Sequence, residues 1–225
     1  MTHFNDEEII DSWKTNARCW IKAIREDEIE SRLLVTNKAI VNAITSRQPA
    51  TVLDAGCGEG WLVRELEKTG IKALGLDAVP ELIAAAQKEA VGRFKCLSYK
   101  AITQDRLKES FDVVVCNFSL LGDDSVTHLF AQVPSLLNKG GAFIVQTLHP
   151  QVGLADGDYN DGWRQGSWAG FNEHFSQPAP WYCRSLKAWK LLYLNNGMKL
   201  LHIDEPIHPK TQKAASIIFS GIKKC

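Results

Sequence analysis

Short apolar runs alternate with helical patterns through the middle of the chain, residues 51–148. The apolar runs have the length of strands and lie at 51–55, 73–77, 93–98, 111–116 and 142–148. Between these runs, apolar residues recur every three or four positions, as they do on one face of a helix. Strands that alternate with helices in this way predict an α/β fold with a parallel, doubly wound sheet.

The two ends of the chain and one insertion depart from this alternation. Residues 5–47 carry two helical patterns, which predict a pair of helices packed on the edge of the domain. Residues 149–182 are rich in Gly, Asp and aromatic residues, and an irregular stretch of this length predicts a lid or binding loop. A helix at 185–193 and two strands at 199–205 and 214–222 are predicted to follow, with the strands paired antiparallel at the sheet edge.

Length and composition bound the class of protein. A chain of 225 residues predicts one domain, which we divide into an N-terminal helical extension (1–49), a core (50–148), a lid (149–182) and a C-terminal helix with a strand pair (183–225). A formal net charge of zero argues against a nucleic-acid partner held by a basic face. We expect no membrane span, because the longest apolar runs have only the length of strands. A monomer or a homodimer is expected.

Cysteines and histidines give no metal-ligand pattern. The six cysteines are scattered along the chain and form no C-x-x-C pair, which predicts free, mostly buried thiols in a reducing cytoplasm. The six histidines also lack the spacing of metal ligands. We therefore expect a cytoplasmic protein without a metal site.

The stretch Thr51–Gly60, TVLDAGCGEG, carries the strongest functional signal. Its apolar run ends in Asp54, and three glycines follow at alternate positions before a helical pattern begins. Glycines permit positive φ and let a ligand approach the backbone, and a helix start offers unpaired N–H groups to an anion. A dinucleotide fingerprint would need glycine at position 61, where this chain has Trp61. A ligand-binding turn is therefore predicted, with a purely structural turn or a dehydrogenase as alternatives.

Two charged residues are candidates for ligand contacts. Asp77 ends the second predicted strand, 21 residues after Gly56, where nucleotide-binding sheets hold a ribose diol with an acid. The alternative is that Asp77 caps the next helix. Arg32 lies in a helix shortly before the first strand and could bind a carboxylate with its planar guanidinium. The alternative for Arg32 is a surface ion pair with Glu28 or Glu30.

Four motifs together resemble those of class I S-adenosylmethionine (SAM)-dependent methyltransferases over residues 50–222. The motifs are VLDAGCGEG at 52–60, GLDAVPELI at 75–83, FDVVVCNFSLL at 111–121 and NKGGAFIVQTLHP at 138–150. Among the subfamilies, the chain is most similar to small-molecule enzymes of the ubiquinone-biosynthesis O-methyltransferase type. The resemblance implies a Rossmann-like, seven-stranded sheet of order 3-2-1-4-5-7-6 with strand 7 antiparallel, N-terminal helices and a lid insertion after strand 5. It also implies SAM as cofactor and S-adenosylhomocysteine (SAH) as product.

The resemblance further implies a set of cofactor-binding residues. The set consists of Arg32, Asp54, Gly56, Cys57, Gly58, Asp77, Ala78, Ser98, Tyr99, Asn117 and Phe118. In this assignment Arg32 holds the methionine carboxylate, Asp54 the amino group and Asp77 both ribose hydroxyls. Residues 98–100 would flank the adenine, although many family members carry an acid there and this chain does not.

The acceptor site is expected beyond strand five. His149 ends that strand, where ligands bind in such sheets, and is the candidate general base for a hydroxyl acceptor. The alternative is a histidine that bonds to the lid backbone. Aromatic residues of the lid are expected to shape an acceptor pocket or, alternatively, to form the core of the lid. They are Tyr159, Trp163, Trp168, Trp181 and Tyr182.

The sequence after strand four favours a small organic acceptor, and the resemblance to O-methyltransferases implies transfer to oxygen. Nucleic-acid amino methyltransferases carry Asn/Asp-Pro-Pro-Tyr there, and cytosine C5 enzymes carry a Pro-Cys nucleophile. Residues 117–120 of this chain read NFSL and match neither pattern. Two alternatives stay open: a protein or RNA methyltransferase, and a SAM-binding regulator without turnover, since binding residues alone do not establish catalysis.

Overall fold

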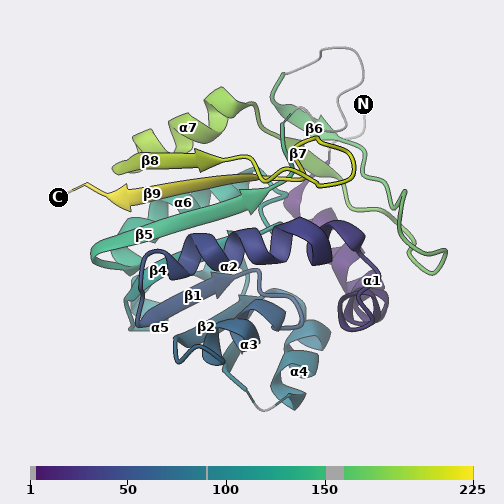
Figure 1. The fold of residues 1–225 in the computed structure, drawn as a ribbon, viewed down its shortest axis with the longest axis horizontal. Coiled ribbons are helices and arrows are strands. Elements are labelled where there is room, and N and C mark those ends of the chain that lie inside the picture. The colour runs from purple at the N-terminus through teal and green to yellow at the C-terminus, as the bar shows by residue number, and fades with distance from the viewer. Residues whose placement is uncertain (1–3, 90, 151–159, 225) are drawn as a thin grey trace.

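The computed structural model describes residues 4–89, 91–150 and 160–224 of an α/β fold (Figure 1). Its helical elements are α1 (Asp6–Arg25), the π-helical turn η1 (Arg32–Thr36), α2 (Asn37–Thr45), α3 (Trp61–Glu67), α4 (Pro80–Lys88), the 3₁₀ turn η2 (Tyr99–Ala101), α5 (Gln104–Leu107), α6 (Asp124–Leu136) and α7 (Leu186–Asn195). Its strands are β1 (Thr51–Ala55), β2 (Lys72–Asp77), β3 (Arg93–Cys96), β4 (Phe111–Asn117), β5 (Leu137–Thr147), β6 (Gly162–Arg164), β7 (Trp181–Cys183), β8 (Met198–Asp204) and β9 (Ile217–Lys223).

Seven strands form one sheet in the order β3-β2-β1-β4-β5-β9-β8. The pairings among β1 to β5 are parallel, and β9 pairs antiparallel with both β5 and β8. This order confirms the predicted 3-2-1-4-5-7-6 with strand 7 antiparallel. Because parallel neighbours end at the same edge, the carboxyl ends of β1, β2, β4 and β5 are brought together there.

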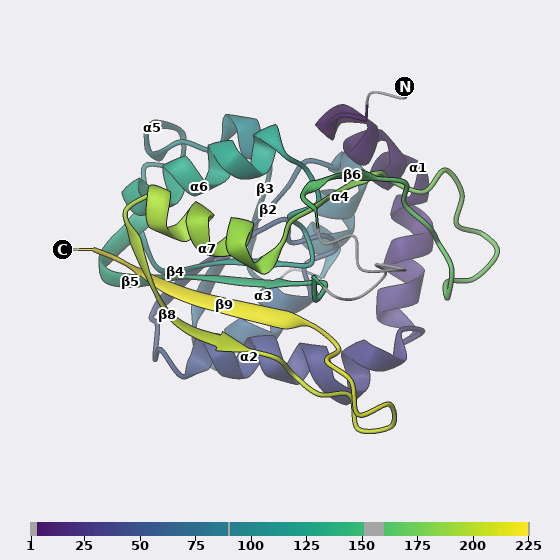
Figure 2. The ribbon, with the colours of Figure 1, turned by 90° about the horizontal axis from the view of Figure 1, so that it is seen from above.

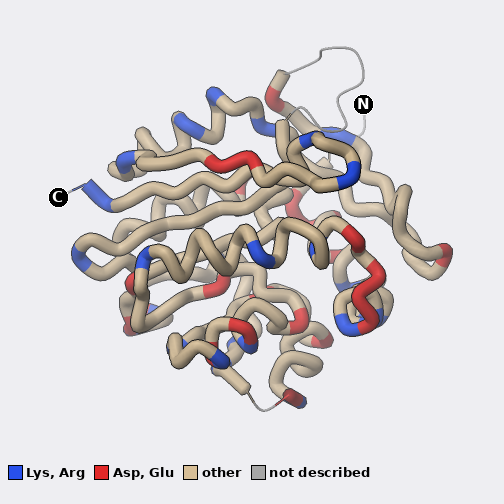
Figure 3. The backbone as a smooth tube through the Cα atoms, viewed as in Figure 1, with Lys and Arg blue, Asp and Glu red and all other residues tan. Residues whose placement is uncertain are grey.

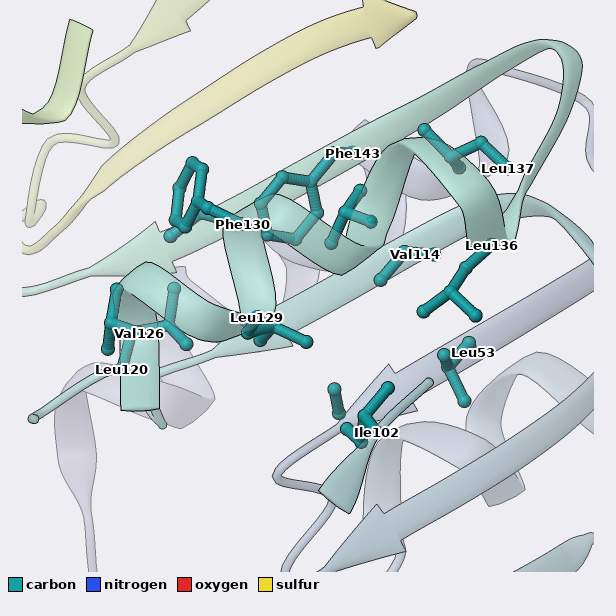
Figure 4. Packing of buried hydrophobic residues seen from close by; sticks show 14 of the residues in the cluster. Leu53, Ile102, Val114, Leu120, Val126, Leu129, Phe130, Leu136, Leu137 and Phe143 are labelled. Atoms are coloured by element: carbon teal, nitrogen blue, oxygen red, sulfur yellow. The ribbon is translucent and has the colours of Figure 1, made fainter. Parts of the chain in front are cut away.

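Helices cover both faces of the sheet, and each covered face has its own core (Figure 2). On one face, buried residues of α2 and α3 pack on β1, β4 and β5. On the other face, α6 and α7 cover the sheet, and Leu129 and Phe130 of α6 point toward the strand residues Val114 and Phe143 (Figure 4). The Phe130 and Phe143 ring centroids lie 4.9 Å apart at 74°. Burial on both faces explains why the central strands read as continuous apolar runs.

Most element boundaries agree with the predictions, and the exceptions involve long-range pairing. β1 has the predicted bounds, whereas β5 begins at Leu137, five residues before the predicted start. Leu137 pairs with Phe111, and the Gly-rich turn that follows is accommodated by a register shift between Phe111 and Val113. Within the lid, β6 and β7 form an antiparallel pair that the irregular sequence did not predict.

Candidate functional site

The glycine turn between β1 and α3 is bound to the end of β2. The backbone N–H groups of Gly56 and Cys57 both donate to the carbonyl oxygen of Leu76, at 2.7 and 2.9 Å. Gly56, Gly58 and Gly60 adopt φ values of +81°, +57° and +87°. Such left-handed conformations disfavour residues with a Cβ, so the backbone alone explains the three glycines.

The space around these glycines differs from one to the next. A Cβ on Gly56 would lie 2.3 Å from Ser119 Cβ, and one on Gly60 would lie 2.8 Å from the Phe94 ring. A Cβ on Gly58 would meet only Trp20 Nε1, at 3.4 Å. Gly56 and Gly60 therefore allow close packing, whereas Gly58 leaves its backbone open to a ligand.

Asp77 connects this turn to the start of α4. Its Oδ2 accepts a 2.9 Å hydrogen bond from the Gly58 N–H, and its Oδ1 accepts one of 2.9 Å from the Val79 N–H. Burial raises the pKa of Asp77, although the N–H groups of Val79, Gly58 and Ala78 oppose this rise. The bond to Val79 agrees with the capping alternative. Each carboxylate oxygen can still accept a further hydrogen bond, so the ribose assignment stays a prediction.

Asp54 supplies a buried carboxylate at the end of β1. The residue is 1% exposed, and its Oδ1 has no hydrogen-bond partner among the described residues. Burial, reinforced by the neighbouring Asp77, raises the pKa of Asp54 to about 8. An unpartnered buried oxygen is unfavourable by about 1–3 kcal/mol. A ligand donor at this position would remove that penalty, and the binding role of Asp54 stays a prediction.

The raised pKa of Asp54 gives the ligand-free protein a distinct pH dependence. Unfolding returns Asp54 toward its ordinary pKa of 3.8, so between about pH 4 and 8 the folded state holds a proton that the unfolded chain releases. The Asp54 contribution to stability therefore falls as pH rises through this window. We expect the free energy of unfolding of Asp54→Asn, relative to wild type, to be higher at pH 8 than at pH 5. Urea unfolding at both pH values measures this difference.

Asp112 provides the matched control for that measurement. Hydrogen bonding, led by the Asn138 side chain, lowers the pKa of Asp112 below 3.8, so its contribution to stability is lost only as pH falls below that value. Asp112→Asn should therefore differ from wild type by the same amount at pH 5 and pH 8. A constant difference for Asp54→Asn as well would contradict the assigned protonation of Asp54.

The end of β4 is both strained and polar. Phe118 adopts φ +53°, a conformation rare for a residue with a bulky side chain, while its N–H donates to the Gln146 carbonyl at 2.8 Å. Beside it, Asn117 Oδ1 is buried without a hydrogen-bond partner among the described residues. Backbone strain and unpartnered polar atoms concentrate at functional sites. Asn117 and Phe118, both predicted cofactor residues, therefore lie at the edge of the sheet where the carboxyl ends of the strands meet.

Arg32 lies at the start of η1 and is 9% exposed. Its guanidinium carbon is 4.5 Å from the centroid of the Trp61 ring, the residue that follows the glycine turn. Burial lowers the pKa of Arg32 to about 10, so the side chain stays charged at neutral pH. The alternative of a surface ion pair is not observed, because Glu28 accepts from Asn172 and Glu30 pairs with Lys210.

A buried carboxylate that the sequence did not reveal fastens two helices to the glycine turn. The side chain of Glu59 is 0% exposed and pairs with Arg64 of α3 at 2.7 Å and with Arg25 of α1 at 3.4 Å. Arg25 also donates to the Ala85 carbonyl at 3.2 Å and pairs with Glu89 at 2.7 Å. Only the closeness of Glu59 and Arg64 in the sequence hinted at this network.

Four further predicted cofactor residues, Cys57, Ala78, Ser98 and Tyr99, lie in or beside the segments that form the site. Cys57 Sγ lies 2.8 Å from the position of a Cβ on Gly75, so the thiol packs in the core and only its backbone borders the turn. The Tyr99 hydroxyl lies 3.1 Å from the Ala55 carbonyl and 3.3 Å from that of Ser119. Ser98 directly precedes the turn η2, which begins at Tyr99. The carbonyl oxygen of the half-buried Ala78 lies 3.8 Å from Cys96 Sγ.

His149 is 8% exposed and lies just beyond β5. Its Nε2 is 3.3 Å from Oε1 of Glu205, whose side chain is 52% exposed. A carboxylate against one ring nitrogen fixes the orientation of an imidazole. The structure therefore supplies a partner that the sequence did not indicate, and the role of His149 as a base stays a prediction.

The predicted acceptor aromatics separate into two groups. The Trp163 and Tyr182 rings pack edge-to-face at 5.6 Å in the β6–β7 pair, which also holds Trp181. Trp163 borders a hollow of about 330 Å³ that is also lined by Lys100. Trp168 instead packs on Trp13 of α1, which agrees with the lid-core alternative. Tyr159 lies outside the described residues.

Comparison with known proteins identifies the family. Residues 29–202 match the family described as "Methyltransferase domain". The chain is 30% identical over 113 residues to the ubiquinone biosynthesis O-methyltransferase of Methylococcus capsulatus, a stretch that covers 48% of each protein. It is 29% identical over 111 residues to the malonyl-acyl-carrier protein O-methyltransferase of Salmonella typhimurium, which covers 49% of this chain and 43% of that protein. The chain thus spans about half the length of the curated relatives it matches.

Solved structures share the fold. A SAM-dependent methyltransferase from Clostridium acetobutylicum superposes with a TM-score of 0.67 at 17% identity, over 93% of this chain and 98% of that one. Another from Mesorhizobium loti gives a TM-score of 0.62 at 20% identity, over 80% of this chain and 96% of that one. The family match covers most of the chain. The chain therefore belongs to the methyltransferase domain family, which confirms its resemblance to the class I SAM-dependent methyltransferases.

Proposed function

We propose that the protein transfers a methyl group from SAM to a small organic acceptor, at an oxygen atom. The observation that carries the proposal is the buried Asp54 carboxylate, whose Oδ1 has no partner among the described residues. Asp54 stands near the end of β1, the strand that leads into the glycine turn, where the backbone of Gly58 is open. The neighbouring Asp77 is close enough to contribute to the raised pKa of Asp54. These groups fit a ligand that brings a cationic amino group and a diol to one turn.

The charged groups around the turn match the polar parts of SAM. In our assignment the buried guanidinium of Arg32 binds the carboxylate of the methionine portion, because its planar fork suits two oxygens. Asp54 accepts from the amino group, and binding of that cation favours the ionised form of Asp54. Asp77 accepts from the ribose hydroxyls with the lone pairs that Gly58 and Val79 leave free.

Bound SAM supplies an electrophilic methyl group on a sulfonium. The chain must align an acceptor with that methyl and remove the acceptor proton, and alignment supplies much of the rate enhancement. We assign proton removal to His149, whose ring is oriented by Glu205 at 3.3 Å. Trp163, Trp181 and Tyr182 of the β6–β7 pair are the proposed walls of the acceptor site.

Two observations support a small acceptor methylated at oxygen. Both relatives described above are named O-methyltransferases, one of ubiquinone biosynthesis and one of malonyl-acyl-carrier protein. Acidic and basic residues are interspersed along the chain (Figure 3), and their totals are equal at 26 each, which does not favour a polyanionic substrate.

No helix in the described ranges is long and apolar enough to cross a membrane. The competing proposals are a protein or RNA methyltransferase and a SAM-binding regulator.

Calorimetric titration with SAM, SAH and NAD tests the cofactor assignment. We expect SAM and SAH to bind with micromolar dissociation constants and NAD not to bind. Binding of NAD alone, or of none of the three, would overturn the proposal. Transfer of labelled methyl from SAM to panels of phenols, quinols and carboxylates then tests the acceptor class. Methylation of RNA or peptides alone would favour the first competitor, and turnover left unchanged by His149→Gln would contradict the base assignment.

A further inference from the structure

Trp20 of α1 reaches the one open glycine of the turn. Its Nε1 lies 3.4 Å from the position that a Cβ on Gly58 would take, and no other atom of the described residues comes within 4 Å of that position. Among the described residues, the indole N–H has no hydrogen-bond partner, and the side chain is partly exposed. The donor therefore lies beside the Gly58 backbone, within reach of a ligand that contacts this turn.

A second set of contacts places Trp20 near the start of α4. Trp20 packs on a small core formed by Ala17, Val79 and Leu82, which joins α1 to α4. Val79 and Gly58 are the two residues whose N–H groups bind Asp77. Trp20 therefore lies near both segments whose N–H groups bind Asp77, the glycine turn and the start of α4.

The helix that carries Trp20 is joined to the lid segment 168–177. The Asn16 side chain donates to the Ser176 carbonyl at 2.7 Å and accepts from the Ser176 N–H at 2.9 Å. Trp13 packs edge-to-face on Trp20 at 5.0 Å and on Trp168 at 5.5 Å. Both ribbon views show the lid beside α1 (Figures 1 and 2). A continuous set of aromatic contacts therefore leads from the glycine turn to the lid.

We propose that Trp20 is a cofactor-contacting residue whose indole N–H donates to a ribose hydroxyl oxygen of bound SAM. Through Trp13 and Trp168, the same contact stabilises the lid segment 168–177, which precedes the β7 strand of the acceptor site. Cofactor binding therefore favours the lid arrangement before the acceptor enters. This inference rests on the proposed function, because it assumes that SAM occupies the turn.

Calorimetric titration with SAH tests the contact in Trp20→Phe, with Trp189→Phe as the control. Trp189 of α7 stacks on Phe219 in the core between α7 and the sheet, so its replacement also exchanges an indole for a phenyl ring but removes no donor at Gly58. Loss of one hydrogen bond should weaken SAH binding about five- to tenfold in Trp20→Phe, which corresponds to about 1–1.4 kcal/mol. Trp189→Phe should change the dissociation constant less than about twofold. Equal affinities of Trp20→Phe and wild type would overturn the inference.

Amide hydrogen exchange tests the coupling to the lid. Saturating SAH should slow exchange in residues 168–177 of the wild type, and this protection should be smaller in Trp20→Phe at the same saturation. Exchange of 168–177 that does not respond to SAH in the wild type would contradict the coupling. Thermal unfolding of both variants verifies that they fold. A wild type that binds neither SAM nor SAH would refute the proposed function itself, which is a separate outcome.

Discussion

Gly56→Ala is expected to abolish cofactor binding and to destabilise the fold by about 2–5 kcal/mol. The added Cβ would lie 2.3 Å from Ser119 Cβ and 2.4 Å from the Tyr99 hydroxyl oxygen, distances that force the turn or the end of β4 to move. Two effects add: the left-handed backbone disfavours alanine by about 1–2 kcal/mol, and overpacking adds about 1–3 kcal/mol. Urea unfolding measures the stability, and titration with SAM measures the binding.

Gly70→Ala separates these two effects. Gly70 adopts φ +82°, almost the same as the +81° of Gly56, but a Cβ there would meet nothing within 4 Å. The control should therefore lose about 1–2 kcal/mol from the backbone alone and bind SAM as the wild type does. If both variants lose the same stability and the same affinity, close packing at Gly56 is not what requires glycine.

Asp77→Ala is expected to lower the affinity for SAM by about 100-fold or more. In the proposed complex the carboxylate accepts from two ribose hydroxyls, and hydrogen bonds to a charged group contribute about 1.5–3 kcal/mol each. The variant also loses the bonds from Gly58 and Val79 that shape the turn. Titration with SAM and SAH measures the affinity, and thermal unfolding measures the structural part of the loss.

Asp112→Ala is the control for that structural part. Asp112 also accepts backbone N–H bonds, from Ala50 and Thr51 at 2.9 Å each, but at the opposite end of the parallel strands. It should lose a comparable amount of stability and keep the wild-type affinity. If Asp77→Ala retained that affinity too, Asp77 would be only the helix-capping residue of the alternative interpretation.

The sheet and the glycine turn could be predicted because their signals are local. Each central strand is buried on both faces and therefore appears as an uninterrupted apolar run. The positive φ values of the turn require glycine at three alternate positions, which makes that turn visible in the sequence. The places of Asp54 and Asp77 could be predicted for the same reason, because both stand at the ends of such strands.

Contacts between distant segments could not be predicted, because no local pattern encodes them. Trp20 has the spacing of a helix core residue, yet it reaches Gly58, 38 positions along the chain. The burial of Glu59 depends on Arg25 from a helix whose docking the sequence does not specify. Glu205 meets His149 only because the β8–β9 pair closes the sheet beside β5. The site therefore consists of a predictable turn and an unpredictable set of side chains that surround it.

The bond between Asn16 and Ser176 has an evolutionary consequence. Asn16 contacts the main chain of residue 176 in both directions, and the Ser176 side chain takes no part in these two bonds. Any residue except proline offers the same N–H and carbonyl groups. This anchor therefore tolerates sequence drift in the lid, so the substrate preference of related proteins can diverge while the lid stays docked on α1.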